Sequence, residues 1–423
     1  MATSRTVLLR LLVAAAAVMT MAGCIAPPPE TARQPVVVTT QKPQRPAPPP
    51  ATAEGYPQLG GVEPGSLVEL DDFDLIDPRI TISGANAWRI RYLSTSAIDD
   101  RPVEVTGVVL VPGGDPPDRG WDVIAFNHGN TGIDKDCGPS LYDDMLSQWL
   151  PISVLLLHGY VVVASDYEGL GGVGPHAFLN AEALGRNVID AVRAARGIRP
   201  DIGPRWAAFG GSLGGLATWA ANEQASTYGA DLELVGAAAW VPVVDVSELP
   251  RKAAAGNLTH DQLHLYFLAI MGLKRTTHPE LDLQRFMRGS IYDNRDLLIV
   301  CNGPGVRDAL EVLESADPAD MKPVDDAAER EMASLLKELA VPQQRMAAPM
   351  LVLYGTADRL VDQPWVERAI QEGCAMGDTI QWVPRAGAGH DTIDASMAFP
   401  WIRERFDRQA PINQCGPHPA GAG

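Results

Sequence analysis

Three residues that could serve as nucleophile, acid and base lie far apart in the chain: Ser212, Asp358 and His390. A serine hydroxyl is a poor nucleophile near neutral pH, so it needs an imidazole within hydrogen-bond reach. The imidazole in turn needs a carboxylate that holds it in the correct tautomer. If the fold brings these residues together, the expected chemistry is attack by Ser212 on a carbonyl carbon, with His390 as the base and Asp358 as its orienting acid.

The sequence around Ser212 predicts a sharp turn between a strand and a helix. Gly210, Ser212 and Gly214 fit the G-x-S-x-G pattern, which follows an apolar stretch at 206–209 and precedes an Ala-rich segment without proline at 213–228. Glycines are needed on both sides because side chains there would collide with neighbouring elements. The helix also directs its positive N-terminus towards the serine, where negative charge would develop. The alternative is a glycine-rich turn that contains a serine by chance.

Asp358 and His390 each follow an apolar segment, 350–354 and 379–383, that we interpret as a strand. Catalytic groups in parallel sheets gather at the carboxyl ends of the strands, so both side chains are expected near the serine. The order Ser, Asp, His along the chain is associated with α/β-hydrolases and differs from that of other serine-triad folds. Three other carboxylates are rival candidates for the acid: Asp245, Asp362 and Asp391.

The oxyanion that forms on the substrate needs two backbone N–H donors. The first is expected from Leu213, directly after the nucleophile, and the second from the loop 128–131 after an earlier strand. His128 in this loop has an alternative interpretation as a base. Asp166 and His176 lie in another loop at the same edge, where a structural role is the simpler interpretation.

Apolar strands alternate with helices along the chain, which predicts an α/β fold with a mostly parallel central sheet and helices on both faces. Further strands are expected at 88–93, 103–111, 123–126, 160–164 and 234–239, and further helices at 152–158 and 181–196. The strand pattern stops after about 247, and helices are expected at 260–271, 293–301, 306–315 and 325–339. We interpret this segment as a mainly helical cap over the active edge of the sheet.

These patterns divide the chain into six parts. They are a lipoprotein-type signal peptide (1–24), a Pro-rich spacer (25–60), the first part of an α/β-hydrolase core (61–246), a helical cap or lid insertion (247–344), the second part of the core (345–408) and a C-terminal tail (409–423).

The N-terminus has the features of an export signal. Arg5 and Arg10 precede the apolar run 11–21, which is too short for a stable membrane span. The cysteine after Ala-Gly is similar to a bacterial lipobox, in which Cys24 is lipidated and becomes the mature N-terminus. Membrane association through that lipid is then expected, with the Pro-rich spacer as an extended tether. Cleavage by an ordinary signal peptidase, without lipidation, is the alternative.

The rest of the composition is globular, with 46% hydrophobic and 20% charged residues. The formal net charge is −18, from 34 basic and 52 acidic side chains, which argues against nucleic acid or an anionic membrane surface as the main partner.

Four cysteines besides Cys24 suggest two disulfides in an exported chain, and their spacing shows no zinc pattern. Of three possible pairings we favour Cys137 with Cys301 and Cys374 with Cys415. Free buried thiols are the alternative.

Several motifs together resemble the secretory lipase family of α/β-hydrolases. They are Asn-His-Gly-Asn-Thr-Gly at 127–132, Cys-Gly-Pro-Ser at 137–140, Asp-Tyr-Glu-Gly-Leu-Gly at 166–171, Gly-Gly-Ser-Leu-Gly-Gly at 210–215, Gly-Thr-Ala-Asp at 355–358 and Gly-His at 389–390. The resemblance covers roughly Ser66 to Phe406 and implies a mainly helical cap over the site. Asn130 stands where the family usually has threonine.

The resemblance assigns roles to particular residues. It implies Ser212 as nucleophile, Asp358 as acid and His390 as base, with no metal or organic cofactor. At the oxyanion hole it implies Leu213 together with Asn130 or Thr131.

We therefore expect an exported lipase or esterase that hydrolyses acylglycerols or similar lipid esters through an acyl-enzyme. Three rival functions remain open: an acyltransferase on the same three residues, a peptidase of the same fold, and a non-catalytic envelope lipoprotein that binds an apolar ligand.

Overall fold

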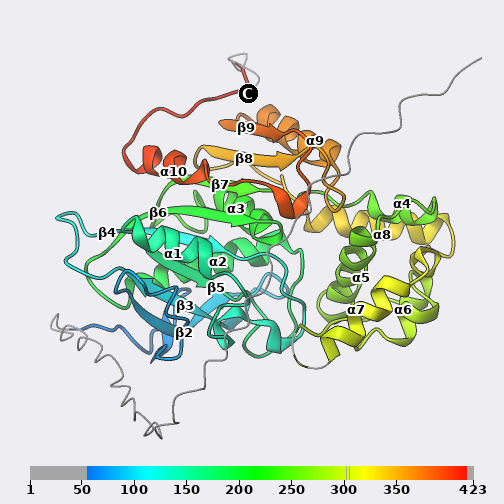
Figure 1. Ribbon diagram of the computed structural model, residues 1–423, viewed down its shortest axis with the longest axis horizontal. Coiled ribbons are helices and arrows are strands. Elements are labelled where there is room, and N and C mark those ends of the chain that lie inside the picture. The colour runs from blue at the N-terminus through cyan, green and yellow to red at the C-terminus, as the bar shows by residue number, and fades with distance from the viewer. Residues whose placement is uncertain (1–54, 302, 304, 417–423) are drawn as a thin grey trace, which may run out of the picture. The chain divides into compact units, whose positions relative to one another are not determined.

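The computed structural model describes residues 55–301, 303 and 305–416 (Figure 1). The predicted signal peptide, Cys24 and nearly all of the Pro-rich spacer lie outside the described residues. In the described part of the chain, no helix combines the length and the apolar character that crossing a membrane requires.

A sheet of nine strands forms the centre of the structure. The strands are β1 (Leu67–Asp72), β2 (Asn86–Thr95), β3 (Pro102–Val111), β4 (Trp121–Asn127), β5 (Val161–Ser165), β6 (Ile202–Gly211), β7 (Glu233–Trp240), β8 (Met350–Gly355) and β9 (Ile380–Arg385). Their spatial order is β1-β2-β3-β5-β4-β6-β7-β8-β9. The pairs from β1 to β5 are antiparallel, and all pairs from β5 to β9 are parallel. This sheet confirms the predicted α/β fold.

The parallel strands are apolar throughout because both of their faces are covered by helices. Along β4, Val123 and Ala125 belong to the hydrophobic cluster that contains α2, α3 and α9, whereas Ile124 and Phe126 belong to the cluster that contains α1 and α10. Full burial of such a side chain contributes about 1.5–3 kcal/mol. The covering helices are α1 (Trp149–Leu157), α2 (Ala181–Arg196), α3 (Leu213–Gln224), α9 (Gln363–Met376) and α10 (Ala398–Phe406). The helix after Ser212 is shorter than predicted, because it ends at Gln224 rather than near Tyr228.

Five α-helices and no strand are found in the described part of residues 247–344, which we call the helical insertion. They are α4 (Leu249–Ala254), α5 (His260–Arg275), α6 (Gly289–Asp293), α7 (Gly305–Ser315) and α8 (Asp326–Leu339). Figure 1 shows them gathered beside one end of the sheet. α5 begins at a capping box, in which the Thr259 hydroxyl accepts from the backbone N–H of Gln262 and the Gln262 side chain accepts from that of Thr259.

The predicted helix at 293–301 is wrong. α6 ends at Asp293, and the chain continues through turns in which the N–H of Leu297 bonds to the carbonyl of Asn294 at 2.8 Å. Residues 297–300 are four consecutive apolar residues, which lack the 3.6-residue spacing that a half-buried helix needs. The segment then ends at Cys301, which a disulfide holds.

Both favoured disulfides are present. Cys137–Cys301 joins the loop before α1 to the helical insertion, and Cys374–Cys415 joins α9 to the C-terminal tail. The tail also pairs with the edge of the sheet, because the N–H of Gln414 donates to the carbonyl of Ile380 at 2.9 Å. An edge strand covered in this way offers fewer free backbone groups to other chains.

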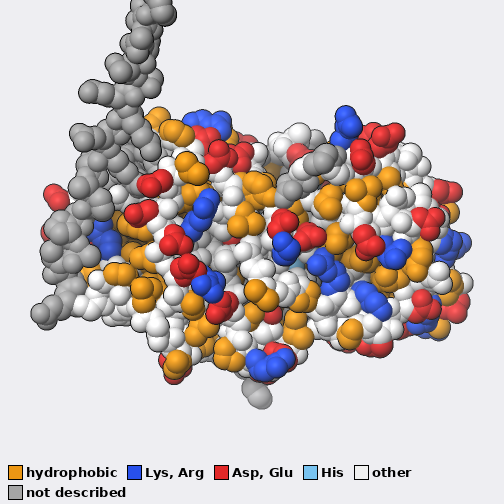
Figure 2. Space-filling view, turned by 90° about the horizontal axis from the view of Figure 1, so that it is seen from below, with side chains coloured by type: hydrophobic (Ala, Val, Ile, Leu, Met, Phe, Trp, Pro, Cys, Tyr) orange, Lys and Arg blue, Asp and Glu red, His pale blue; other side chains and the backbone are white. Residues whose placement is uncertain are grey.

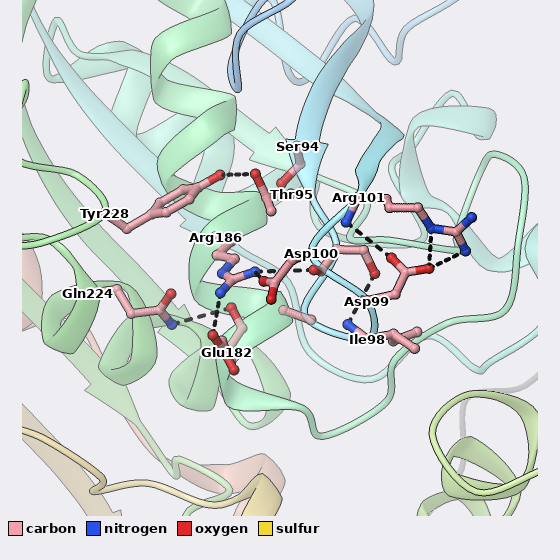
Figure 3. A network of polar contacts seen from close by, with 12 residues as sticks. Ser94, Thr95, Ile98, Asp99, Asp100, Arg101, Glu182, Arg186, Gln224 and Tyr228 are labelled. Carbon is pink, nitrogen blue, oxygen red and sulfur yellow. Dashed lines mark hydrogen bonds and ion pairs between the residues drawn. The ribbon is translucent and has the colours of Figure 1, made fainter.

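A network of polar contacts fixes α2 against the turn between β2 and β3 (Figure 3). The Arg186 guanidinium donates to the Asp100 carboxylate at 2.8 Å, and it also contacts Glu182 one turn earlier in α2. Nearby, the Thr95 hydroxyl donates to the Tyr228 hydroxyl oxygen at 3.0 Å. Ion pairs with such exposed carboxylates are worth at most about 1 kcal/mol each, so the network mainly sets the position of α2.

Candidate active site

Ser212 occupies the turn between β6 and α3 with φ 56° and ψ −121°, a conformation that residues with side chains rarely adopt. A Cβ on Gly210 would lie 2.7 Å from the Cβ of Asn127, and one on Gly214 would lie 1.9 Å from the Asn127 carbonyl oxygen. The close approach of β4 therefore requires both glycines, as predicted. The turn places the serine at the N-terminus of α3, where the helix favours negative charge.

The side chains of Ser212, His390 and Asp358 form a continuous series of hydrogen bonds. The Ser212 Oγ lies 2.9 Å from His390 Nε2, and His390 Nδ1 lies 2.8 Å from Asp358 Oδ2. The Asp358 carboxylate is 3% exposed and also accepts from the backbone N–H of Leu360 at 2.8 Å and of Val361 at 3.0 Å. A carboxylate held in this way accepts the Nδ1–H proton, which leaves Nε2 free to accept from the serine hydroxyl.

The rival acids bind lysines or, within the described residues, form no hydrogen bond to the imidazole. The Asp245 carboxylate accepts from Lys337 at 2.8 Å, and the Asp362 carboxylate accepts from Lys252 at 2.6 Å. Asp391 is exposed and has no hydrogen bond to His390 among the described residues. Asp358 is thus the candidate acid that meets the base.

His128, the rival base, is buried beneath the loop next to Ser212. Its Nδ1–H donates to the Gly129 carbonyl at 2.7 Å, and its ring stacks on Tyr167 with 4.4 Å between ring centroids. Burial lowers the pKa of His128 to about 4, so the imidazole is neutral and serves the packing of the loop.

The three residues predicted for the oxyanion hole differ in position. Leu213 and Asn130 line the same cavity as Ser212, whereas Thr131 is not in that lining. The Thr131 hydroxyl instead donates to the Cys137 carbonyl at 2.8 Å. Asn130 uses its side-chain oxygen to accept the N–H of Gly132 at 2.9 Å, which shapes the turn of the loop.

Asp166 and His176 have structural partners. The Asp166 carboxylate accepts from the backbone N–H of Ser140 at 2.9 Å and from the Thr106 hydroxyl at 2.7 Å, and burial raises the pKa of Asp166. His176 Nδ1–H donates to the Glu168 carbonyl at 2.8 Å. Both residues hold the loops at the edge of the sheet, as the simpler interpretation of the sequence predicted.

A cavity of about 330 Å³ opens at Ser212 and His390. Most of its wall is apolar and comes from both the core and the helical insertion: Phe178, Leu179, Leu213, Val243, Leu265, Leu310, Leu313 and Leu360. Volumes of this size and apolar walls are typical of small-molecule sites. Among the described residues, no group of three His, Cys, Asp or Glu side chains is arranged to hold a metal ion.

Sequence reasoning missed the polar residues that the helical insertion contributes to this cavity: His260, Asp261, His264 and Glu314. They lie on α5 and α7, and no sequence motif marks them. Which face of an inserted helix meets the cavity depends on how that helix packs, so helical spacing alone could not have identified them.

The fold and this site define an α/β-hydrolase: a mostly parallel sheet carries a serine on a strand-to-helix turn, followed in the chain by an aspartate and a histidine. The structure is similar to Candida antarctica lipase A in its closed state, with a TM-score of 0.69 and 20% identity, covering 85% of this chain and 86% of that one. It is also similar to the rice cell wall degrading esterase LipA of Xanthomonas oryzae, with a TM-score of 0.62 and 17% identity over 82% of this chain and all of the esterase.

The chain belongs to the secretory lipase family, whose sequence profile matches residues 146–414. It is accordingly a carboxylic ester hydrolase. Family membership and the two disulfides indicate an exported protein.

Two curated proteins are also similar to this chain in sequence. A secreted triacylglycerol lipase of Malassezia globosa is 25% identical over 356 residues, which cover 78% of this chain and 74% of the relative. A protein of Mycobacterium tuberculosis described as a probable inactive lipase is 23% identical over 362 residues, covering 81% of this chain and 78% of the relative.

Proposed function

We propose that this ester hydrolase acts on lipid esters through Ser212, His390 and Asp358. The observation that carries the proposal is the unbroken series of hydrogen bonds from the Asp358 carboxylate through His390 to the Ser212 hydroxyl, at the edge of an apolar cavity. One relative is described as a probable inactive lipase, so similarity alone does not argue for activity. The complete series of hydrogen bonds among Asp358, His390 and Ser212 is the feature of this chain that favours it.

The proposed reaction proceeds in two halves. Ser212 Oγ attacks the ester carbonyl carbon while His390 Nε2 takes the hydroxyl proton, and the backbone N–H groups of Leu213 and Asn130 stabilise the oxyanion. His390 then gives the proton to the leaving alcohol, which leaves an acyl group on Ser212. Water attacks this acyl-enzyme with His390 again as the base, and the carboxylic acid is released.

The first test is hydrolysis of p-nitrophenyl esters with acyl chains from acetate to palmitate. The Ser212→Ala variant should lose at least about 10⁴-fold in kcat, because no other group can form the acyl-enzyme. Ser396→Ala, which removes a hydroxyl outside the cavity, is the matched control. Activity of a folded Ser212→Ala variant above about 1% of wild type would overturn the assignment.

If the wild-type protein cleaves none of these esters, one of the three rival functions becomes the better explanation. Labelling of Ser212 by an organophosphate would then favour an acyltransferase or a peptidase, and a protein inert to the organophosphate would be a binding lipoprotein. Product analysis with an added alcohol, and a panel of amide substrates, separate the first two.

We also propose that the chain is anchored to the cell envelope through a lipid on Cys24. The support is the sequence alone: basic residues, a short apolar run and Ala-Gly immediately before the cysteine. The Pro-rich residues that follow would hold the hydrolase away from the membrane surface.

A further inference from the structure

In the described part of the chain, the rim of the Ser212 cavity carries three carboxylates and no Lys or Arg side chain. Asp261 at the start of α5, Glu314 near the end of α7 and Asp391 beside His390 all line this cavity. Among the described residues, none of the three forms an ion pair with Lys or Arg, and no Lys or Arg lines the cavity. The rim therefore carries an excess of negative charge near the Ser212 hydroxyl.

This imbalance is local and is not a simple consequence of the acidic composition. Figure 2 shows basic and acidic side chains interspersed on one face of the molecule. The helical insertion itself pairs several of its acids, for example Glu331 with Arg285 and Glu248 with Arg251. The cavity lining differs because its described residues include three carboxylates and no Lys or Arg at all.

The histidine deepest in the wall does not offset this charge. Burial lowers the pKa of His264, which keeps its imidazole neutral, and its buried Nε2 has no hydrogen-bond partner among the described residues. The other imidazoles in the lining are His260 and His390. The fixed charges in the lining are therefore the three carboxylates, which give it a negative potential.

We propose that the rim selects ester substrates by charge, so that esters with a neutral or cationic acyl chain are accepted and esters with a carboxylate on that chain are rejected. The inference rests on the proposed function, because the selected step is acyl transfer to Ser212. A partly solvated rim charge changes kcat/KM for a charged substrate by about two- to threefold, and three together by about tenfold at low ionic strength.

The test compares three p-nitrophenyl esters of similar length: the neutral hexanoate, the cationic 6-(trimethylammonio)hexanoate and the anionic monoester of adipic acid. All release the same leaving group, and each rate is corrected for spontaneous hydrolysis. Burial in an apolar wall disfavours both charged chains, so the ratio of kcat/KM for the cationic over the anionic ester isolates the effect of the rim. The assays run at pH 8 in 10 mM and in 500 mM salt.

The variant Asp261→Asn/Glu314→Gln removes two rim charges and keeps the shapes of the side chains. The matched control Asp115→Asn/Asp118→Asn removes two exposed charges from the turn before β4, at the opposite ends of the parallel strands. For wild type and the control we expect a cationic-to-anionic ratio of at least about tenfold at low salt. For the rim variant we expect this ratio to fall about threefold or more, and 500 mM salt should have a similar effect on wild type.

Each result separates the two proposals. Cleavage of the neutral ester with a ratio near one, or with a ratio that the rim variant leaves unchanged, overturns the charge selection and leaves the ester hydrolase standing. A wild-type protein that fails to cleave even the neutral ester overturns the proposed function itself.

Discussion

Tyr167 supports the backbone beside the nucleophile although it lies outside the cavity lining. Its φ of 71° is strained for a residue with a side chain, and its buried hydroxyl donates to the His128 carbonyl at 3.1 Å. That carbonyl lies next to Gly214, at the start of α3. Tyr167 thus links the loop that offers Asn130 to the turn that offers Ser212, which makes it a positioning residue.

We expect Tyr167→Phe to lower kcat about three- to tenfold with little change in KM, because the loop that we propose to bind the oxyanion loses one support. The free energy of unfolding should fall by about 1 kcal/mol, the usual net value of a buried hydrogen bond. Steady-state kinetics and urea unfolding measure the two effects.

Tyr228→Phe is the matched control for this prediction. Its hydroxyl donates to the Asp190 carboxylate at 2.6 Å, and Tyr228 does not line the Ser212 cavity. The control should lose stability and keep kcat. An equal fall in kcat for both variants would mean that Tyr167 affects activity only through general stability.

At the scale of elements, α3 joins the nucleophile to the segment that returns from the helical insertion to β8. Glu223 in the last turn of α3 is 3% exposed and accepts from the Trp219 indole at 3.0 Å and from the backbone N–H of Gln343 at 3.2 Å. Burial, helped by the negative charge of Asp378, raises the pKa of Glu223 to about 8.

This raised pKa predicts how stability depends on pH. Between about pH 4.5 and pH 8 the folded protein holds a proton on Glu223 that the unfolded chain has lost, so this residue lowers the free energy of unfolding as pH rises. Glu223→Gln mimics the protonated form and should be more stable than wild type by about 2–4 kcal/mol at pH 8, with little difference at pH 4.5. Thermal and urea unfolding across this range measure it.

The exposed Glu311→Gln, which removes the same charge from α7, controls for net charge and should show no such trend. A constant difference between the Glu223→Gln variant and wild type at all pH values would contradict the prediction.

The sequence predicts most elements that hold the candidate site, for identifiable reasons. Buried parallel strands are continuous apolar runs, and the turn at Ser212 needs glycines at fixed positions, so both leave local signals. The helix predicted at 293–301 is wrong because the apolar residues of this segment are consecutive, without helical spacing, and the segment ends at a disulfide. The rim acids Asp261 and Glu314 leave no local signal, since their place at the cavity depends on how α5 and α7 pack against the core.

At the scale of the whole molecule, the chain combines a hydrolase core with an N-terminal segment that lies outside the described residues. The core is tied at both disulfides, and its C-terminal tail covers the β9 edge. We propose that the N-terminal segment, through its predicted export signal and Cys24, determines where this enzyme acts.

If Cys24 carries a lipid, expression in a bacterium with a lipoprotein pathway should place the protein in the membrane fraction. Labelling with an alkyne fatty acid should tag the wild type, and Cys24→Ala should lose the tag and shift to the soluble fraction with unchanged kcat on soluble esters. A single acyl chain binds membranes only marginally, so stable fractionation also reports more than one chain. An untagged wild type that is nevertheless exported would show ordinary signal cleavage.

The two disulfides also decide what happens when a protease cuts the chain. Any cut between Cys137 and Cys301, or between Cys374 and Cys415, leaves two pieces joined by a bridge. A cut between Cys301 and Cys374 leaves pieces with no covalent link. An exported enzyme of this design remains one molecule after a cut between Cys137 and Cys301 or between Cys374 and Cys415. A single cut divides it in the strands β1 to β4 before Cys137, or in the stretch between Cys301 and Cys374 that contains α7 and α8.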